Sequence, residues 1–408
     1  MPAFSYLYSI PYLIIFCLLL INSIPLIDKS NCNVIDYNKV ITFQKIFVIT
    51  ILIIFLGFRG YIMIDWINYS KFYAASPTLF DNHNLIKNMI KSGMMNGIII
   101  ERGFLVYMMI CKTISSNYLF FQFISFIVDL IILYQFFKRE IPEYIIMGFV
   151  FFLIFYGIQL EMHILRNAKA MLLFLISIKY IKEKSFYNFF LLNCIGALFH
   201  ISSLFYIPLY FIINKTIPRS LLLILFVIGN FIYLLRVEWL KSILSHISLP
   251  GRIGYLIKTY LVSERYSVFA TIGIGYIERS FTFLLVFFLS KKIISIDKND
   301  NIYINTIYLY CYIYLYFSEM YIFIERVVNL FVFSYWIIYP KIYSLISKQI
   351  KYAFILLLFI YGNLKLARNN NRIYYLYDNI LLSYRSSQER EYNYKQNQLK
   401  IFNKGNTN

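Results

Sequence analysis

Arginines and carboxylates near the ends of long apolar runs are the residues best suited to chemistry in this chain. A guanidinium keeps its charge and offers a planar fork that matches two phosphate oxygens, so arginines gathered in one pocket could hold a doubly charged phosphate group. Ten charged residues fall on one predicted membrane face: Arg59, Asp65, Glu101, Arg102, Glu161, Arg166, Glu278, Arg279, Glu325 and Arg326. The alternative is that they are plain interfacial charges, although sequence neighbours such as Glu278 and Arg279 do not face each other on a helix.

Two histidines stand close to apolar segments. His200 lies in the run Leu-Phe-His-Ile-Ser-Ser, where a lone histidine is either a hydrogen-bonded structural group or a functional one. Ionisable groups are costly inside a membrane and tend to be functional there. His163 and Arg166 have the i, i+3 spacing that would place both side chains on one helical face, if a helix begins that early.

The sequence carries no signature of a nucleotide or metal site. It has no G-x-x-x-x-G-K-[ST], no G-x-G-x-x-G after a strand and no H-E-x-x-H. Its five cysteines form no C-x-x-C pair, so neither a disulfide framework nor a thiolate metal site is predicted. The outer-face carboxylates are too dispersed for a divalent-cation cage. We therefore expect no metal, no cofactor and a phosphate-handling site that relies on arginine.

The composition requires membrane helices to position these residues. Of 408 residues, 60% are hydrophobic and only 14% are charged, whereas a soluble domain has about 25% charged residues. A water-soluble enzyme and a disordered scaffold are both excluded. The net charge of +19 is better explained by anionic lipid, an anionic substrate and loop topology than by nucleic acid.

Apolar runs that can cross a hydrocarbon core of roughly 30 Å predict an all-α polytopic membrane protein with about ten to twelve transmembrane helices. The runs are 6–26, 45–58, 118–137, 144–159, 168–181, 186–213, 221–235, 271–289, 302–317, 327–346 and 352–364. The run 186–213 is either one tilted helix or two half-spans broken near His200.

Basic residues set the expected topology. Lys29, Lys39 and Lys45 follow the first run, so the positive-inside bias puts the amino terminus outside and the first loop in the cytoplasm. A transmembrane domain is expected over 1–365, with two larger outer-face loops at 59–117 and 236–269. The remaining residues, 366–408, are expected to form a polar, partly disordered tail.

Short motifs follow one another in a set order: Gly57-Phe58-Arg59-Gly60, Asp65-Trp66-Ile67-Asn68-Tyr69, Glu101-Arg102-Gly103-Phe104, Leu165-Arg166-Asn167-Ala168, Ala197-Leu198-Phe199-His200-Ile201-Ser202 and Glu325-Arg326. Their order and the hydropathy profile from about residue 50 to 340 resemble the EpsG family of bacterial polysaccharide polymerases, relatives of the Wzy O-antigen and capsule polymerases. Two positions depart from the family pattern, because Asn167 stands where Gln is usual and Arg102 where Pro is frequent.

The resemblance implies a GT-C-like membrane glycosyltransferase in the bacterial inner membrane, with its active site on the outer face. Such an enzyme joins oligosaccharide repeat units carried on undecaprenyl pyrophosphate. Its partners would be this lipid-linked substrate and membrane lipids, and could include a chain-length regulator and a flippase. No nucleic acid and no cofactor are implied.

The resemblance also suggests roles for single residues. A departing pyrophosphate calls for fixed cations, and the candidates are Arg59, Arg166 and Arg326. The wider substrate-binding set adds three residues, Arg279, Glu101 and Tyr69. A base must take the proton of the acceptor hydroxyl; His200 is favoured, because imidazole titrates near neutral pH. Asp65 is the other candidate, or it orients the arginines or a sugar hydroxyl.

Two other functions stay open at this point. A lipid-linked oligosaccharide flippase would also need many helices and a basic cavity. Against it, no internal repeat is visible and the charges gather at one face instead of lining a path through the membrane. An O-antigen-ligase-like transferase would share the donor lipid, and the sequence does not separate it from a polymerase.

Overall fold

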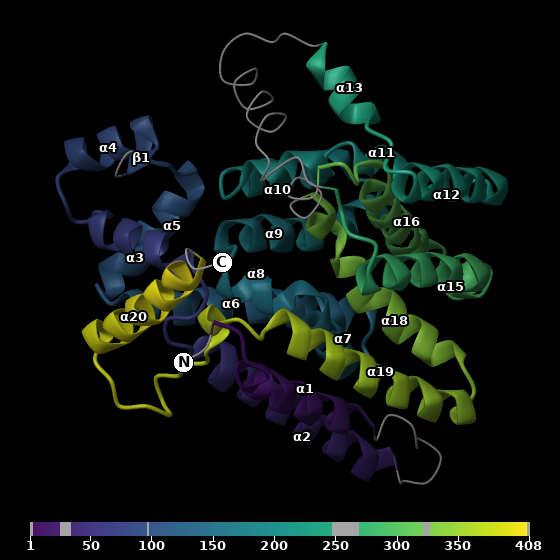
Figure 1. Ribbon diagram of the computed structural model, residues 1–408, viewed down its shortest axis with the longest axis horizontal. Coiled ribbons are helices and arrows are strands. Elements are labelled where there is room, and N and C mark those ends of the chain that lie inside the picture. Colours follow the sequence, from purple (N-terminus) through teal and green to yellow (C-terminus); the bar gives the residue numbers. More distant parts are fainter. Residues whose placement is uncertain (1–2, 25–33, 96–97, 247–268, 321–326, 406–408) are drawn as a thin grey trace. The chain divides into compact units, whose positions relative to one another are not determined.

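The computed structural model describes residues 3–24, 34–95, 98–246, 269–320 and 327–405. Its contacts divide the chain into two compact units, residues 1–207 with 346–408, and residues 208–345. Figure 1 shows that helices make up almost all of the regular structure in both units. The predicted all-α polytopic membrane architecture is confirmed.

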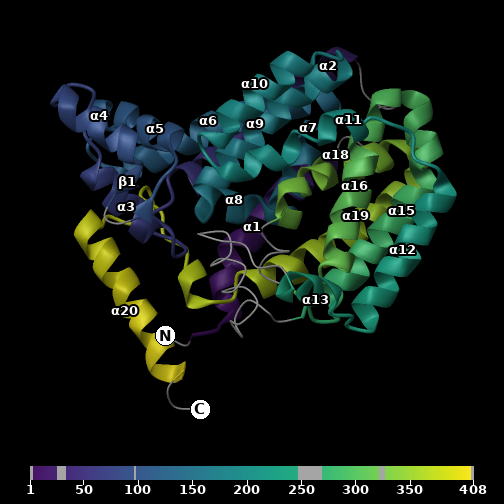
Figure 2. The same cartoon turned by 90° about the horizontal axis from the view of Figure 1, so that it is seen from above.

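The first unit contains most of the predicted site. Its elements are η1 (Tyr6–Ser9), α1 (Ile10–Ser23), α2 (Val34–Leu52), η3 (Ile53–Gly57), α3 (Trp66–Ala75), α4 (His83–Ser92), β1 (Met94–Met95), β2 (Ile98–Ile99), α5 (Arg102–Ile114), α6 (Tyr118–Glu140), α7 (Ile145–Phe152), η4 (Leu153–Gly157), α8 (Ile158–Met162), α9 (Leu165–Lys182), α10 (Phe186–Ala197), η5 (Ile201–Tyr206), α19 (Lys348–Asn369), η8 (Ile373–Tyr375) and α20 (Ser387–Gly405). The two-residue strands β1 and β2 pair antiparallel. Figure 2 shows α9 and α10 side by side.

The second unit consists mainly of α11 (Leu209–Ile212), α12 (Arg219–Leu234), α13 (Trp239–Ser245), α15 (Ile274–Ile296), α16 (Asn301–Tyr316) and α18 (Phe333–Leu345). Tyrosines of α16 hold α12 in place: the hydroxyl of Tyr312 donates to the carbonyl of Leu222 at 2.8 Å, and that of Tyr316 donates to Leu225 at 2.9 Å. These bonds satisfy hydroxyls that would otherwise be buried without a partner in an apolar environment.

Five helical stretches of the described residues are long and apolar enough to cross a membrane: Tyr6–Ser23, Lys39–Gly57, Tyr118–Glu140, Ile145–Met162 and Lys348–Asn369. A sixth would come from α12 and α13, which are bent by 78°. This count is lower than the expected ten to twelve for two reasons. Charges such as Arg166 and Lys169 interrupt α9, and α16 and α18 are shorter than a full span.

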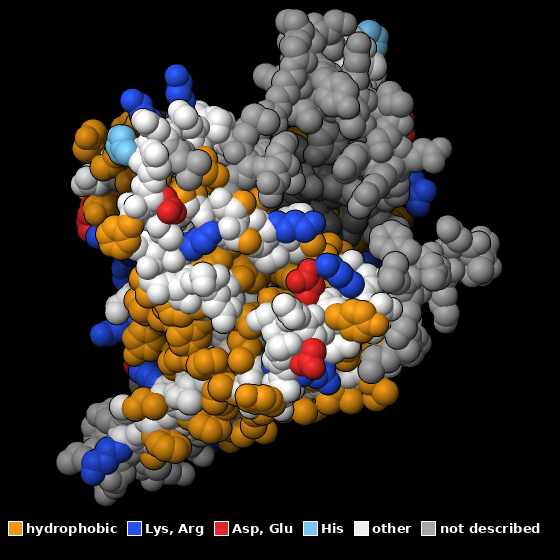
Figure 3. Space-filling view, turned by 90° about the vertical axis from the view of Figure 1, so that its left-hand side faces the viewer, with side chains coloured by type: hydrophobic (Ala, Val, Ile, Leu, Met, Phe, Trp, Pro, Cys, Tyr) orange, Lys and Arg blue, Asp and Glu red, His pale blue; other side chains and the backbone are white. Residues whose placement is uncertain are grey.

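Exposed apolar side chains support contact with lipid. Only 17% of the apolar window of α19 is buried, and α2 exposes Phe43 and Ile46. Figure 3 shows a face with hydrophobic side chains gathered over its lower part and charged ones interspersed above. In water such a surface would be unfavourable, whereas in a bilayer it faces hydrocarbon.

The long run 186–213 is broken near His200, as one of the two alternatives predicted. Helix α10 ends at Ala197, and a 3₁₀-helix, η5, begins at Ile201. The loop 59–117 carries α3, α4 and α5, whose ends follow ordinary capping rules. For example, the side chain of Asn82 accepts a hydrogen bond from the backbone N–H of Asn84, and α4 ends at Gly93 with a left-handed φ of 59°.

The C-terminal segment differs from the expected polar, partly disordered tail. After α19, residues 371–380 run back along residues 54–63, and we call them the C-terminal strap. The N–H of Gly60 donates to the carbonyl of Asp378 at 2.9 Å, and that of Ile380 donates to Phe58 at 2.8 Å. A Cβ at Gly60 would lie 1.9 Å from Oδ2 of Asp378. The backbone of the strap therefore supplies hydrogen-bond partners for the backbone that follows η3.

Candidate functional site

An arginine–glutamate pair lies where two helices begin. Arg166 is the second residue of α9, and Glu101 is the N-cap of α5. Nη1 of Arg166 lies 2.6 Å from Oε2 of Glu101, and the two side chains are 27% and 21% exposed. Helix N-termini favour negative charge. A partly open ion pair in this position could exchange its carboxylate for a phosphate oxygen.

Tyr69 joins this pair from α3. Its buried hydroxyl accepts a hydrogen bond from the Arg166 guanidinium. Burial raises the pKa of Tyr69, although the charge of Arg166 works in the opposite direction. Burial also opposes the charged form of Arg166, but Tyr69 and Glu101 together raise the pKa of the guanidinium above its ordinary value. The arginine is therefore a permanent cation, and its direction is set by two side chains.

Asp65 faces a histidine. Oδ2 of Asp65 lies 3.5 Å from Nδ1 of His163, and each side chain is about one-third exposed. The chain breaks at His163 and Ile164, so α9 begins only at Leu165. His163 and Arg166 consequently do not share one helical face as their spacing had suggested, and the break turns the imidazole toward α3.

The segment around His200 docks on the start of α5. The carbonyl of Leu198 accepts from the N–H groups of Gly103 at 2.8 Å and Phe104 at 3.2 Å. A Cβ at Gly103 would lie 2.7 Å from the Cβ of Leu198, so the glycine permits this close approach. The motif around Glu101 and the motif around His200, almost a hundred residues apart, therefore meet through their backbones.

The imidazole of His200 caps η5. Its Nδ1 accepts a hydrogen bond from the N–H of Ser202 at 3.2 Å and lies 2.8 Å from the hydroxyl of the same residue. An Nδ1 that accepts from a backbone N–H carries no proton, so the neutral ring holds its proton on Nε2. In this conformation His200 stabilises the 3₁₀-helix, and the nitrogen that could accept a proton is already engaged.

Arg59 is buried beneath the surface, with 1% of its area exposed. Its guanidinium donates to the carbonyl of Leu56 at 2.5 Å and also to the carbonyl of Glu161. These bonds join the end of η3 to α8. The structure therefore places Arg59 where it holds two backbone segments together, which differs from the predicted contact with a leaving pyrophosphate.

The two remaining arginines of the predicted set belong to other parts of the chain. Arg279 belongs to the second unit, where its guanidinium lies 4.1 Å from the ring centre of Tyr314 and donates to the carbonyl of Gly275 at 2.8 Å. Arg326 lies outside the described residues. The first unit thus brings together Asp65, Tyr69, Glu101, Arg166 and, through its backbone, the segment of His200.

Sequence reasoning missed a buried ion pair below the cluster. Nζ of Lys169 lies 2.5 Å from Oδ1 of Asp129 and donates to the carbonyl of Ser125 at 2.8 Å. It also lies 5.4 Å from the ring centre of Tyr107 on α5. This pair ties α9 to α6 and α5, one turn below Arg166. The signal in the sequence was Asp129 in the middle of an apolar run, a position where a charge is rare.

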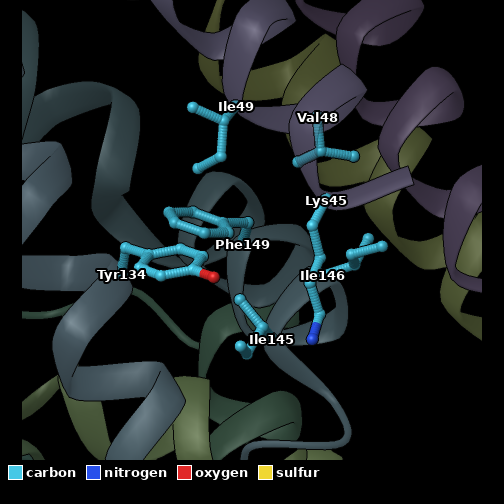
Figure 4. A pocket seen from close by; sticks show the side chains of 7 residues that line it. All are labelled: Lys45, Val48, Ile49, Tyr134, Ile145, Ile146 and Phe149. Atoms are coloured by element: carbon cyan, nitrogen blue, oxygen red, sulfur yellow. The ribbon is translucent and has the colours of Figure 1, made fainter. Parts of the chain in front are cut away.

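Other features do not coincide with the cluster. A narrow crevice with no room for a water molecule lies among α2, α6 and α7, lined by Lys45, Val48, Ile49, Tyr134, Ile145, Ile146 and Phe149 (Figure 4). It contains none of the predicted site residues. Within the described residues, no group of three or more His, Cys, Asp or Glu side chains is arranged to hold a metal ion.

Fold and site define a multi-pass membrane protein whose cluster of ionisable side chains lies at the beginnings of α3, α5 and α9. The chain belongs to the EpsG family, whose model matches residues 42–379. This range includes Arg59 and every member of the cluster, and it ends within the C-terminal strap. No curated protein and no solved structure matches the chain. Family membership and the membrane helices support a role in polysaccharide biosynthesis of the polymerase type.

Proposed function

We propose that this protein is a membrane glycosyltransferase that polymerises undecaprenyl-pyrophosphate-linked oligosaccharide repeat units into a surface polysaccharide. It would act at the outer face of the bacterial inner membrane, beside a flippase that supplies the units and a regulator of chain length. The observation that carries the proposal is the Arg166–Glu101–Tyr69 cluster, which lies inside the segment that matches the family.

In the proposed reaction, an acceptor hydroxyl attacks the anomeric carbon of the growing glycan. The bond between that carbon and the pyrophosphate oxygen breaks, and both electrons leave on the phosphate. Negative charge therefore develops on the pyrophosphate in the transition state, and a cation already in place stabilises it without reorganisation. Arg166 would supply this charge, while Tyr69 holds the guanidinium in position and Glu101 gives way to the phosphate.

The donor lipid also fits the rest of the sequence. Nucleotide sugars are not present outside the cytoplasmic membrane, so a glycosyl donor there must be activated before it arrives. A lipid pyrophosphate meets this need and explains why the chain carries no nucleotide-binding motif. Both substrates would approach from the bilayer, which is consistent with a site where His163 directly follows the apolar stretch Ile145–Met162.

The full-length protein in lipid nanodiscs, incubated with a synthetic undecaprenyl-pyrophosphate repeat unit, tests the proposal. A ladder of products would support a polymerase. A single transfer to another acceptor would indicate a ligase, and transport without chemistry would indicate a flippase; either outcome would overturn the proposal.

Arg166→Ala should reduce polymer formation by at least about a hundredfold, because one preorganised electrostatic contact contributes about 10²–10³ in rate. Arg368→Ala is the matched control, since this arginine is exposed in the last turn of α19. Both variants should insert in the membrane in normal amounts. Wild-type chain lengths from Arg166→Ala would refute the assigned role of the arginine.

A further inference from the structure

We propose that His163, oriented by Asp65, is the general base that takes the proton of the acceptor hydroxyl. This inference rests on the proposed glycosyltransferase function. It assigns the base to a histidine other than His200, and it makes Asp65 a positioning residue that acts through the imidazole.

The imidazole of His163 has its Nδ1 side buried next to Asp65 and the rest of the ring partly exposed. Its Nδ1 is buried and lies 3.5 Å from the Asp65 carboxylate, yet 32% of the side chain is exposed. The exposed part therefore belongs to the rest of the ring, which includes Nε2. A carboxylate at Nδ1 fixes the tautomer with the proton on Nδ1 and leaves the lone pair on Nε2. Hydrogen bonds at catalytic sites often lengthen without substrate and shorten when it binds.

Asp65 sits on a rigid support. Its carbonyl accepts from the N–H groups of Asn68 at 3.0 Å and Tyr69 at 3.1 Å, so its backbone forms the start of α3. The next residue, Trp66, is 2% exposed, and its ring stacks on that of Tyr61 with centres 4.0 Å apart. Side chains held this firmly keep a carboxylate in a defined direction, which a positioning residue requires.

The proposed base lies close to the proposed leaving-group cation. His163 and Arg166 are three positions apart in the sequence, so their Cα atoms are at most about 11 Å apart. Helix α3 contacts both the imidazole of His163 and the guanidinium of Arg166. Asp65 at its start faces His163, and Tyr69 one turn later accepts a hydrogen bond from Arg166. A proton acceptor and a phosphate-binding cation would thus flank one sugar ring, as the two ends of a displacement require.

His200 is less suited to this role in the observed geometry. Its Nδ1 already accepts from the backbone of Ser202, and its Nε2 carries the proton of the neutral ring. Accepting a further proton would break the cap of η5. His163 has the opposite arrangement, with the acceptor nitrogen on the exposed part of the ring.

The step is balanced as follows. Nε2 of His163 takes the hydroxyl proton while the acceptor oxygen forms its bond to the anomeric carbon. The bond from that carbon to the pyrophosphate breaks, and its electron pair leaves with the phosphate held by Arg166. The resulting imidazolium is stabilised by the Asp65 carboxylate and later gives its proton to water.

Kinetics of the full-length protein with the synthetic lipid-linked unit test the assignment. His163→Ala should lower kcat by about 10²–10⁴, the usual contribution of a general base, with little change in KM for the donor. Added imidazole should restore part of the lost rate. Asp65→Asn should lower kcat as well, and imidazole should not restore it. His83→Ala is the matched control, because His83 is exposed at the start of α4.

A second variant separates catalysis from folding. His163→Gln keeps a polar side chain of similar reach but cannot accept the proton, so it should be as inactive as His163→Ala while both retain the thermal stability of the wild type. Activity of either variant within a few fold of the wild type would overturn the assignment, as would a loss in His163→Ala that imidazole does not relieve. Absence of any product from the wild type would instead refute the proposed function itself.

Discussion

The ion pair of Lys169 and Asp129 gives the most direct test of how α9 is held. The Asp129 side chain is fully buried and that of Lys169 is 6% exposed. Lys169→Met removes the cation and leaves a buried carboxylate without its charge partner, which costs about 3–5 kcal/mol. Asp129→Leu leaves the lysine charge in the same position and should cost a similar amount.

The double variant Asp129→Leu/Lys169→Met removes both charges together. Because an apolar pair of similar volume avoids the desolvation of two ions, its stability should lie close to that of the wild type. Reversible unfolding in mixed micelles measures the three variants, and the cycle isolates the coupling energy. A coupling energy near zero would refute the view that this pair locks α9 to α6.

The activity of the double variant adds a second result. If the pair only stabilises the fold, the double variant should polymerise like the wild type. If it also sets the position of Arg166, one turn away on α9, the double variant should remain folded but make polymer more slowly. The structure favours the second outcome, since the Lys169 ammonium also contacts the ring of Tyr107 on α5, the helix that Glu101 caps.

Two further predictions concern neighbouring contacts. Tyr69→Phe removes the hydroxyl that accepts a hydrogen bond from Arg166. Because a hydrogen bond to a charged group contributes about 1.5–3 kcal/mol, turnover in the nanodisc assay should fall about ten- to a hundredfold. An unchanged rate would show that the hydroxyl does not orient the guanidinium. Gly60→Ala would bring a Cβ to within 1.9 Å of the Asp378 carboxylate, so it should lower the free energy of unfolding by about 1–3 kcal/mol. Unfolding experiments and the protease sensitivity of the C-terminal strap measure this effect. Unchanged stability and unchanged protease sensitivity would contradict the close packing of Gly60 against Asp378.

Much of the architecture could be predicted from the sequence, because apolar runs and charge positions are local signals. The all-helical membrane fold follows from hydropathy, whereas the break near His200 is one of two alternatives that the length of the run 186–213 leaves open. The predicted topology places Asp65, Glu101 and Arg166 on one membrane face together with seven other charged residues, which does not specify the contacts among them.

Other features depend on long-range contacts that no local pattern records. The C-terminal strap belongs to the predicted tail, and its order comes from hydrogen bonds to backbone groups more than 300 residues earlier. The buried guanidinium of Arg59 donates a hydrogen bond to the carbonyl of Glu161, which belongs to a helix about a hundred residues later in the chain. Similarly, the sequence shows that Lys169 is charged, but it does not show that its ion-pair partner is Asp129, forty residues earlier.

The first helical segments, η1 and α1, form hydrogen bonds with α19 and the C-terminal strap, and this has a consequence for how the protein is made. Ser9 and Tyr12 of the first helical segments donate to the carbonyls of Ala367 and Tyr375, at 2.9 Å in each case. These acceptors lie 358 and 363 residues further along the chain than their donors, so they are synthesised much later. Helix α1 must therefore remain in the bilayer, with these polar side chains held by lipid or by the insertion machinery, until α19 and the C-terminal strap have been synthesised.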